Sequence, residues 1–194
     1  MYSRDRKKQT KGGRPGKSRL APSSRWNPSL RYLGAFIALL GVFYLLYGTH
    51  VFEQALLVPF VTLQADVASF ILNLFGAGTG VRDALLVGPS VSLNIAKGCD
   101  GLEATVLFLF AVGLMPFSKK SRAAGLLVGG LFLVLLNMIR IAGLYLAKAY
   151  WPEGFELLHI HGGFALFTLA SVLLWAGWAG WAMEREKISQ HETS

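Results

Sequence analysis

Long apolar segments constrain the fold of this chain more than any other feature. Residues 32–47 with their flanks, 123–150 and 157–183 are each long enough to cross a lipid bilayer, which takes about 20 apolar residues. A fourth segment, residues 101–117, has about 17 residues and lies at the short end of that range. Only 15% of the residues are charged, too few to cover the surface of a soluble domain of this size. The sequence therefore predicts an integral membrane protein.

Basic residues are concentrated before the first apolar segment. Ten of the 19 lysine and arginine residues lie in the first 31 positions. Few aromatic residues interleave with them and the segment leads straight into a span, so we expect a disordered cytoplasmic leader that contacts anionic lipid and binds no nucleic acid. The predicted organisation is a leader at 1–31, a membrane domain at 32–183 and a cytoplasmic tail at 184–194.

The segment 51–78 is apolar but carries polar residues at helical spacing. Thr62, Asp66, Ser69 and Asn73 recur at steps of four, three and four, which places one polar stripe along a helix after a break or kink at Pro59. Such a helix lies in the interface, re-enters the membrane, or packs its stripe against a polar cavity. Residues 76–98 then show the alternation of a short extended hairpin.

Charge bias gives the topology. If the segment 51–78 does not cross, fifteen basic residues lie on the cytoplasmic side and only Arg82, Lys97 and Lys148 lie at the outer side. We therefore predict an all-α integral membrane protein: a bundle of about four transmembrane helices with both termini in the cytoplasm. An amphipathic outer-face or re-entrant helix and a short extracytoplasmic hairpin complete the predicted fold.

Three chemically active side chains are predicted to reach the outer boundary of the bundle. The single cysteine, Cys99, directly precedes the second predicted span. Arg140 follows Arg122 by 18 residues, about 27 Å along a helix, close to the thickness of the hydrocarbon core. His159 and His161 open the last span from the same side. An arginine inside an apolar run costs at least about 2.5 kcal/mol to insert, which favours a function for it.

The three side-chain types suit nucleophilic catalysis. A cation such as Arg140 lowers the pKa of a thiol from about 8.5, or stabilises the oxyanion of a tetrahedral intermediate. His159 is placed to take the proton of Cys99 and to return it to a leaving amine. The product is a thioester on Cys99, which water or an amine then attacks. Asn137, one helical turn before Arg140, is a candidate to orient it or to contact substrate.

Two other functions remain open at this point. One is a metal-dependent membrane hydrolase, with ligands from Cys99, His159, His161 and either Asp100 or Glu103. No HExxH-like pair of histidines occurs on one helix, and Arg140 would repel a cation, so we expect no metal and no other cofactor. The other is a non-enzymatic assembly protein in which the polar residues only hold helices together.

Three motifs, each tied to a span, carry a family resemblance. In the order "GCDGLEA", "NMIRIAGLYL" and "FELLHIHGGFALF", they make the chain resemble the exosortase/archaeosortase family over roughly residues 56–181. The resemblance implies an integral membrane cysteine transpeptidase of the bacterial inner membrane. Its implied substrates are exported proteins with a C-terminal sorting signal: a short motif, one transmembrane helix and a basic cluster. It also implies that Cys99 is the nucleophile and that Arg140 and His159 complete an extracytoplasmic active site.

Within that family the chain looks most like exosortase H, which is linked to IPTL-type signals. Asp100 stands where many members have a serine, so its carboxylate would oppose thiolate formation unless Arg140 pairs with it. Gly162 and Gly163 follow the histidines where an aromatic residue is frequent, which leaves His161 as a rival to His159. The spacing from Phe155 favours His159.

Overall fold

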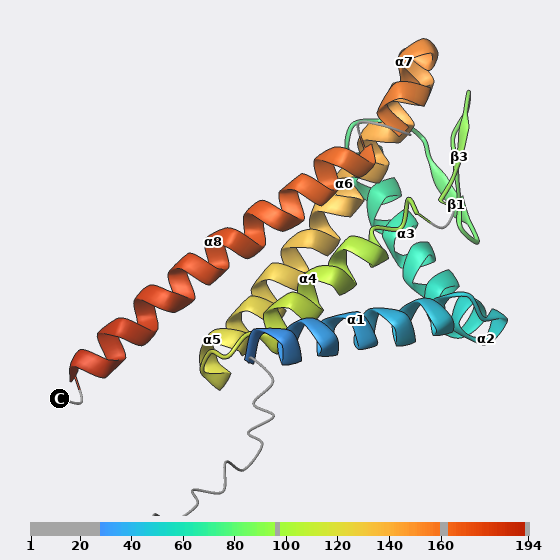
Figure 1. Cartoon of the computed structure of the whole chain (residues 1–194). Coiled ribbons are helices and arrows are strands. Elements are labelled where there is room, and N and C mark those ends of the chain that lie inside the picture. Colours follow the sequence, from blue (N-terminus) through green and yellow to red (C-terminus); the bar gives the residue numbers. More distant parts are fainter. Residues whose placement is uncertain (1–27, 96–97, 160–162, 193–194) are drawn as a thin grey trace, which may run out of the picture.

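The computed structural model describes residues 28–95, 98–159 and 163–192 (Figure 1). Most of the predicted leader lies outside these ranges, and the last helix continues over most of the segment predicted as a tail. The helical elements are α1 (Pro28–Tyr47), α2 (His50–Phe52), η1 (Glu53–Leu57), α3 (Val58–Leu74), α4 (Leu102–Leu114), α5 (Lys119–Ala124), η2 (Gly125–Gly129), α6 (Gly130–Tyr150), α7 (Pro152–Leu157) and α8 (Gly163–Glu192). The strands are β1 (Gly80–Arg82), β2 (Leu85–Val87) and β3 (Ser92–Asn94).

The prediction of an all-α integral membrane protein is confirmed. Within the described residues, four helical segments are long and apolar enough to cross a membrane: Ser29–Tyr47, His50–Leu74, Lys119–Tyr150 and Ala165–Ser189. This set differs from the predicted one at one place. The helix ending at Leu74 qualifies by length and hydropathy, whereas α4, within the predicted span 101–117, has only 13 residues.

The bundle brings the beginning of α4 beside the middle of α6. Figure 1 shows α4, α6 and α8 running in roughly one direction, with α3 crossing that direction. Gly129 permits the contact between α4 and the helix leading into α6, because a Cβ atom there would lie 2.3 Å from Cζ of Phe108. This packing fixes the register between the two helices that carry the candidate site.

Proline does not break the second helix. Instead of a break at Pro59, the structure has the π-helical turn η1 directly before α3, and the helix continues from residue 50 to residue 74. A proline lacks the N–H of a regular α-helical hydrogen bond and its ring crowds the preceding carbonyls, and a wider turn accommodates both.

The predicted polar stripe on α3 is divided between two environments. Ser69 and Asn73 bind Thr79 just before β1: Asn73 Nδ2 donates to the Thr79 carbonyl at 2.8 Å, and the hydroxyls of Ser69 and Thr79 lie 2.9 Å apart. Asp66 is exposed and Thr62 half-buried. The stripe therefore serves partly to attach the end of α3 to the sheet.

The segment predicted as a hairpin forms three short antiparallel strands. They pair in the order β1-β2-β3, with Leu86 opposite both Val81 and Leu93. Leu86 and Leu93 are buried against α3 and α6, so the sheet closes the end of the bundle at which α3 ends.

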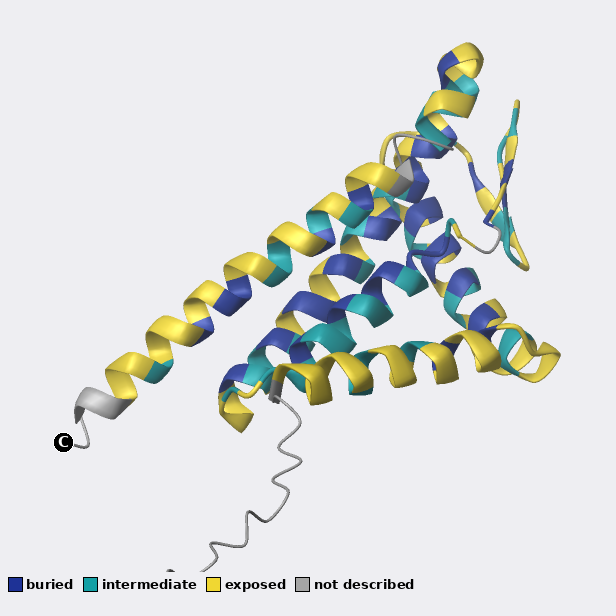
Figure 2. Cartoon of the chain, in the orientation of Figure 1, coloured by how far each residue is buried: buried dark blue, intermediate teal, exposed yellow. Residues whose placement is uncertain are grey.

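Buried residues form two clusters, while long faces of α1 and α8 expose apolar side chains (Figure 2). Exposed apolar helix faces are what a lipid environment requires. The outer cluster consists of Phe43, Tyr47, Leu57, Val61, Ala65, Ala68, Leu72, Leu86, Leu93, Ile95, Ile141, Ala142, Leu144 and Tyr145. The inner cluster consists of Ala104, Phe108, Val112, Leu133, Phe167, Trp178, Ala179 and Ala182. Cys99 and Leu102 pack against the outer cluster, and Phe167, from the inner one, lies under Arg140.

Candidate active site

Cys99 lies in a tight turn that two glycines make possible. Gly98 and Gly101 have φ angles of +88° and +67°, a left-handed region that side chains disfavour. Gly101 also lies against Asn137, since a Cβ atom there would be 2.7 Å from Cγ of that residue. Gly101 is the N-cap residue of α4, and its carbonyl accepts hydrogen bonds from the amide and hydroxyl of Thr105. The sequence "GCDG" thus presents Cys99 at the start of α4.

Asp100 is buried beside the thiol but is bound elsewhere. Its exposed fraction is 1%. Tyr47 donates its hydroxyl to Asp100 Oδ2 at 3.0 Å, and the Leu102 amide donates to Oδ1 at 2.8 Å. The carboxylate therefore caps the first turn of α4 and ties it to the end of α1. The pair between Arg140 and Asp100 that was considered from the sequence is not formed. Tyr47 and the Leu102 amide bind the carboxylate oxygens of Asp100 instead.

Arg140 reaches the thiol from α6. Its Nη2 donates toward Cys99 Sγ at 3.8 Å, and its Nη1 donates to Asn137 Oδ1 at 3.3 Å. The guanidinium carbon lies 5.9 Å from the centre of the Phe167 ring, a cation–π contact. Asn137 and Arg140 share a helix face, as their spacing of three predicts. Arg140 Nε is buried and has no hydrogen-bond partner among the described residues.

A buried amide pair holds the cysteine turn in place. Gln64 on α3, whose exposed fraction is 0%, donates from Nε2 to the Asp100 carbonyl at 3.1 Å. Asn137 Nδ2 donates to Gln64 Oε1 and also to the Cys99 carbonyl at 3.3 Å. The backbone on both sides of the Cys99–Asp100 peptide is therefore bound by α3 and α6. The same Asn137 side chain positions Arg140.

His159 approaches the thiol from the end of α7. Its Nδ1 lies 3.4 Å and its Nε2 3.8 Å from Cys99 Sγ. The imidazole stacks on the ring of Phe155 at 5.3 Å with an interplanar angle of 14°. Phe155 is one helical turn earlier, so both rings lie on one face. Gly154 allows Trp151 to pack against the same helix, since a Cβ there would lie 2.4 Å from the indole ring.

The thiol sits in mixed electrostatic surroundings. Burial raises the pKa of Cys99 above its ordinary value, the charge and hydrogen bond of Arg140 oppose that rise, and the Asp100 carboxylate adds to it. Because burial outweighs the opposing effect of Arg140, these surroundings favour the neutral thiol over the thiolate. A proton acceptor in contact with the sulfur is then needed for reaction, and His159 is in that position.

The structure thus brings Cys99, Arg140, His159 and Asn137 to one point. Glu103, on the first turn of α4, lines a small space together with Arg140. His161 lies outside the described residues. Within the described residues, no three of the His, Cys, Asp and Glu side chains form a group that could hold a metal ion. His161, one of the ligands predicted for a metal site, is not among those described residues.

Gln64 and Tyr47 belong to the site but are not among the residues predicted for it from the sequence. The polar residues at 62, 66, 69 and 73 indicate one face of the helix as the polar face, whereas Gln64 lies on the opposite face. It falls among Leu57, Val61, Ala68 and Leu72, which are all buried. A polar side chain in the apolar face of a helix is the pattern that indicates a buried hydrogen-bond partner.

The fold and the site define an integral membrane protein in which one thiol contacts both a guanidinium and an imidazole at one end of the bundle. The chain matches the family model for the transmembrane exosortase (Exosortase_EpsH) over residues 25–176. It therefore belongs to the transmembrane exosortase family, and the family predicted from the three motifs is confirmed. No curated protein and no solved structure matches the chain significantly.

Proposed function

We propose that this chain is a membrane-embedded cysteine transpeptidase of the bacterial inner membrane. It cleaves exported proteins at a C-terminal sorting signal made of a motif, a transmembrane helix and a basic cluster. The observation that carries the proposal is the contact of one sulfur with two functional groups: Cys99 Sγ lies 3.4 Å from His159 Nδ1 and 3.8 Å from Arg140 Nη2. Membership of the transmembrane exosortase family supports the same activity.

The proposed reaction proceeds in two steps. His159 takes the proton from Cys99 as the sulfur attacks the carbonyl carbon of the scissile peptide bond, and the electron pair of the C=O bond moves to the oxygen. Arg140 stabilises that oxyanion. When the intermediate collapses, the C–N bond breaks and His159 returns the proton to the leaving amine, which departs with the transmembrane helix. An acceptor amine or water then attacks the thioester and frees Cys99.

The neighbouring residues take supporting roles in this proposal. Asn137 holds Arg140 and the Cys99 carbonyl, so it fixes the guanidinium relative to the sulfur. Phe155 holds the imidazole by stacking. In this proposal these residues lie at the extracytoplasmic face, because the charge bias of membrane proteins favours the basic leader and the loop 117–122 on the cytoplasmic side. His161 and Glu103 are further candidates around the same point.

The test is C-terminal processing of a signal-bearing protein co-expressed with the wild type and with single variants. We expect Cys99→Ala, Arg140→Ala and His159→Ala each to reduce cleavage by at least about a hundredfold, as loss of a nucleophile, oxyanion donor or general base does. Arg82→Ala and His50→Ala are matched controls, because Arg82 and His50 are an exposed arginine on β1 and an exposed histidine on α2.

Membrane insertion of each variant is measured in parallel by the accessibility of its termini. Cleavage that persists in an inserted Cys99→Ala protein would refute the thioester mechanism. Loss of cleavage in His161→Ala but not in His159→Ala would transfer the role of the base. Trapping of the thioester with hydroxylamine, in the wild type only, would identify the intermediate directly.

A further inference from the structure

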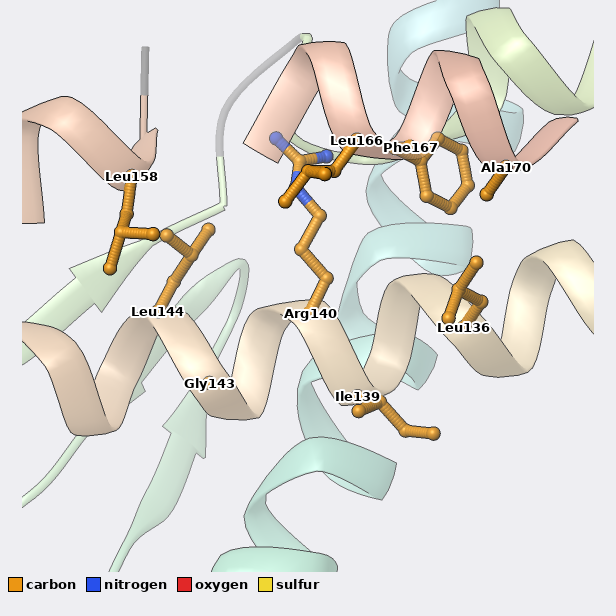
Figure 3. Close-up of a pocket in the computed structure, with 9 residues that line it drawn as sticks. All are labelled: Leu136, Ile139, Arg140, Gly143, Leu144, Leu158, Leu166, Phe167 and Ala170. Carbon is orange, nitrogen blue, oxygen red and sulfur yellow. The ribbon is translucent and has the colours of Figure 1, made fainter. Parts of the chain in front are cut away.

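An apolar groove on the lipid side of the bundle leads to the candidate active site. It has a volume of about 410 Å³ and lies between the outer half of α6, the beginning of α8 and Leu158 (Figure 3). Its lining residues are Leu136, Ile139, Arg140, Gly143, Leu144, Leu158, Leu166, Phe167 and Ala170. Ile139 and Leu166 are 61% and 64% exposed. The groove is therefore open toward the membrane.

Arg140 joins this groove to the thiol. It is the only charged residue among the lining residues, and Figure 3 shows its side chain extending from α6 toward the start of α8. The same guanidinium lies 3.8 Å from Cys99 Sγ through Nη2. A chain lying in the groove would therefore pass beside the sulfur at the level of Arg140.

The length of the groove fits about two turns of a helix, not a complete transmembrane helix. On α6 the lining runs over the nine residues from Leu136 to Leu144, a rise of about 12 Å. Gly143 is exposed and Ala170 is small, so a second backbone can approach closely, as in packed membrane helices. Leu136, Ile139 and Ala170 line the deeper half of the groove, and Gly143, Leu144 and Leu158 line the outer half.

The position of Arg140 beside the nucleophile favours a peptide over a lipid phosphate as the occupant. Nη1 and Nη2 each make one contact, to Asn137 and to Cys99, and each nitrogen carries a second N–H group. A peptide carbonyl held by such an N–H lies beside the thiol and offers it a carbon to attack, whereas a phosphate does not. The adjacent sulfur thus matches a peptide carbonyl.

We infer that this groove binds the junction between the recognition motif and the transmembrane helix of the substrate, an inference that rests on the proposed function. The first apolar turns of the helix occupy the deeper half beside Leu136 and Ala170. The motif occupies the outer half beside Gly143. The scissile carbonyl then lies at the level of Arg140, next to Cys99.

Gly143→Leu tests the groove without disturbing the fold, because a Cβ at Gly143 meets no atom within 4 Å. We expect it to slow processing by about tenfold or more, through overpacking of the helix contact. Gly177→Leu is the matched control on α8: its Cβ also meets nothing within 4 Å and it lies outside the groove. Maleimide labelling of the single cysteine, Cys99, is expected to be unchanged in both variants.

Photo-crosslinking separates this inference from the proposed cleavage. A benzophenone amino acid is placed at Ile139 or Leu166 in the groove, and at exposed Leu173 as a control, in Cys99→Ala protein so that bound substrate stays intact. Crosslinks to the signal-bearing protein from the two groove positions alone support the inference, even if the wild type fails to cleave. Crosslinks to phospholipid only would overturn the inference, and so would a cleavage rate that Gly143→Leu leaves at the wild-type value. The proposed function is tested separately, by Cys99→Ala.

Discussion

The most specific prediction about the stability of the site concerns the buried amide pair between Gln64 and Asn137. Gln64→Leu removes two hydrogen bonds, one to the Asp100 carbonyl and one from Asn137 Nδ2. Asn137 Nδ2 keeps the Cys99 carbonyl as an acceptor. The Asp100 carbonyl loses the donor that Gln64 supplied, at a position inside the protein, since Gln64 is fully buried.

The magnitude follows from these contacts. A hydrogen bond between membrane helices contributes about 0.6 kcal/mol on average, so two contribute about 1.2 kcal/mol. A buried carbonyl left without a donor costs about 1–3 kcal/mol more. We therefore expect Gln64→Leu to lower the free energy of unfolding by about 2–4 kcal/mol. Gln54→Leu is the matched control: Gln54 is exposed on η1, and such surface changes stay within about 0.5 kcal/mol.

A double-mutant cycle with Asn137→Ala identifies the pair itself. Asn137→Ala leaves Gln64 Oε1 buried without its donor, whereas the double variant removes that atom and loses the shared hydrogen bond only once, so the loss is expected to fall short of the sum by about 1–2 kcal/mol. Unfolding is measured in mixed detergent micelles, with maleimide labelling of Cys99 as a second readout of a loosened turn. Additive losses, or a Gln64→Leu protein as stable as Gln54→Leu, would show that the amide pair does not hold the cysteine turn.

Two further predictions concern the thiol and its turn. Asp100→Asn should lower the pKa of Cys99 and Arg140→Gln should raise it, because the first removes a negative neighbour and the second a positive one. The pH dependence of Cys99 alkylation measures both shifts. Shifts of the pKa in the same direction would contradict the opposing effects of the two charges. Gly101→Ala should lose at least about 2 kcal/mol of stability, from the positive φ and the Asn137 contact. Gly113→Ala, whose Cβ meets nothing, should be neutral or slightly stabilising in the same unfolding assay.

The parts of the fold that the sequence predicted are those that depend on local composition. Apolar runs gave the membrane helices, and counting residues along α6 placed Arg140 at the depth of Cys99. Whether a segment is long enough to span was harder to judge. The helix from residue 50 to residue 74 continues through Pro59 because a π-helical turn absorbs the proline, and α4 ends at Leu114, before Pro116. Both outcomes depend on packing and backbone geometry rather than on hydropathy.

The hydrogen-bond partners inside the site could not be predicted, because they come from segments far apart in the chain. Tyr47 lies 53 residues from Asp100 and Gln64 lies 73 from Asn137. The direction in which α3 crosses the bundle decides which of its faces meets Cys99, and no periodicity within α3 carries that information. His161 lies outside the described residues. The variants His159→Ala and His161→Ala distinguish which of the two histidines is the general base.

The separate partners of Asp100 and Arg140 bear on how the charges are used. A direct pair between them would neutralise the guanidinium in the low-dielectric site and leave little field at the sulfur. Instead, Asp100 is bound by Tyr47 and the Leu102 amide, and Arg140 faces neutral Asn137, the thiol and the Phe167 ring. An arginine at membrane depth is costly, and one whose hydrogen-bond partners among the described residues are neutral keeps its charge available. In the proposed reaction, the negative charge that forms beside it is the substrate oxyanion, so the resting arrangement stores the interaction that the transition state requires.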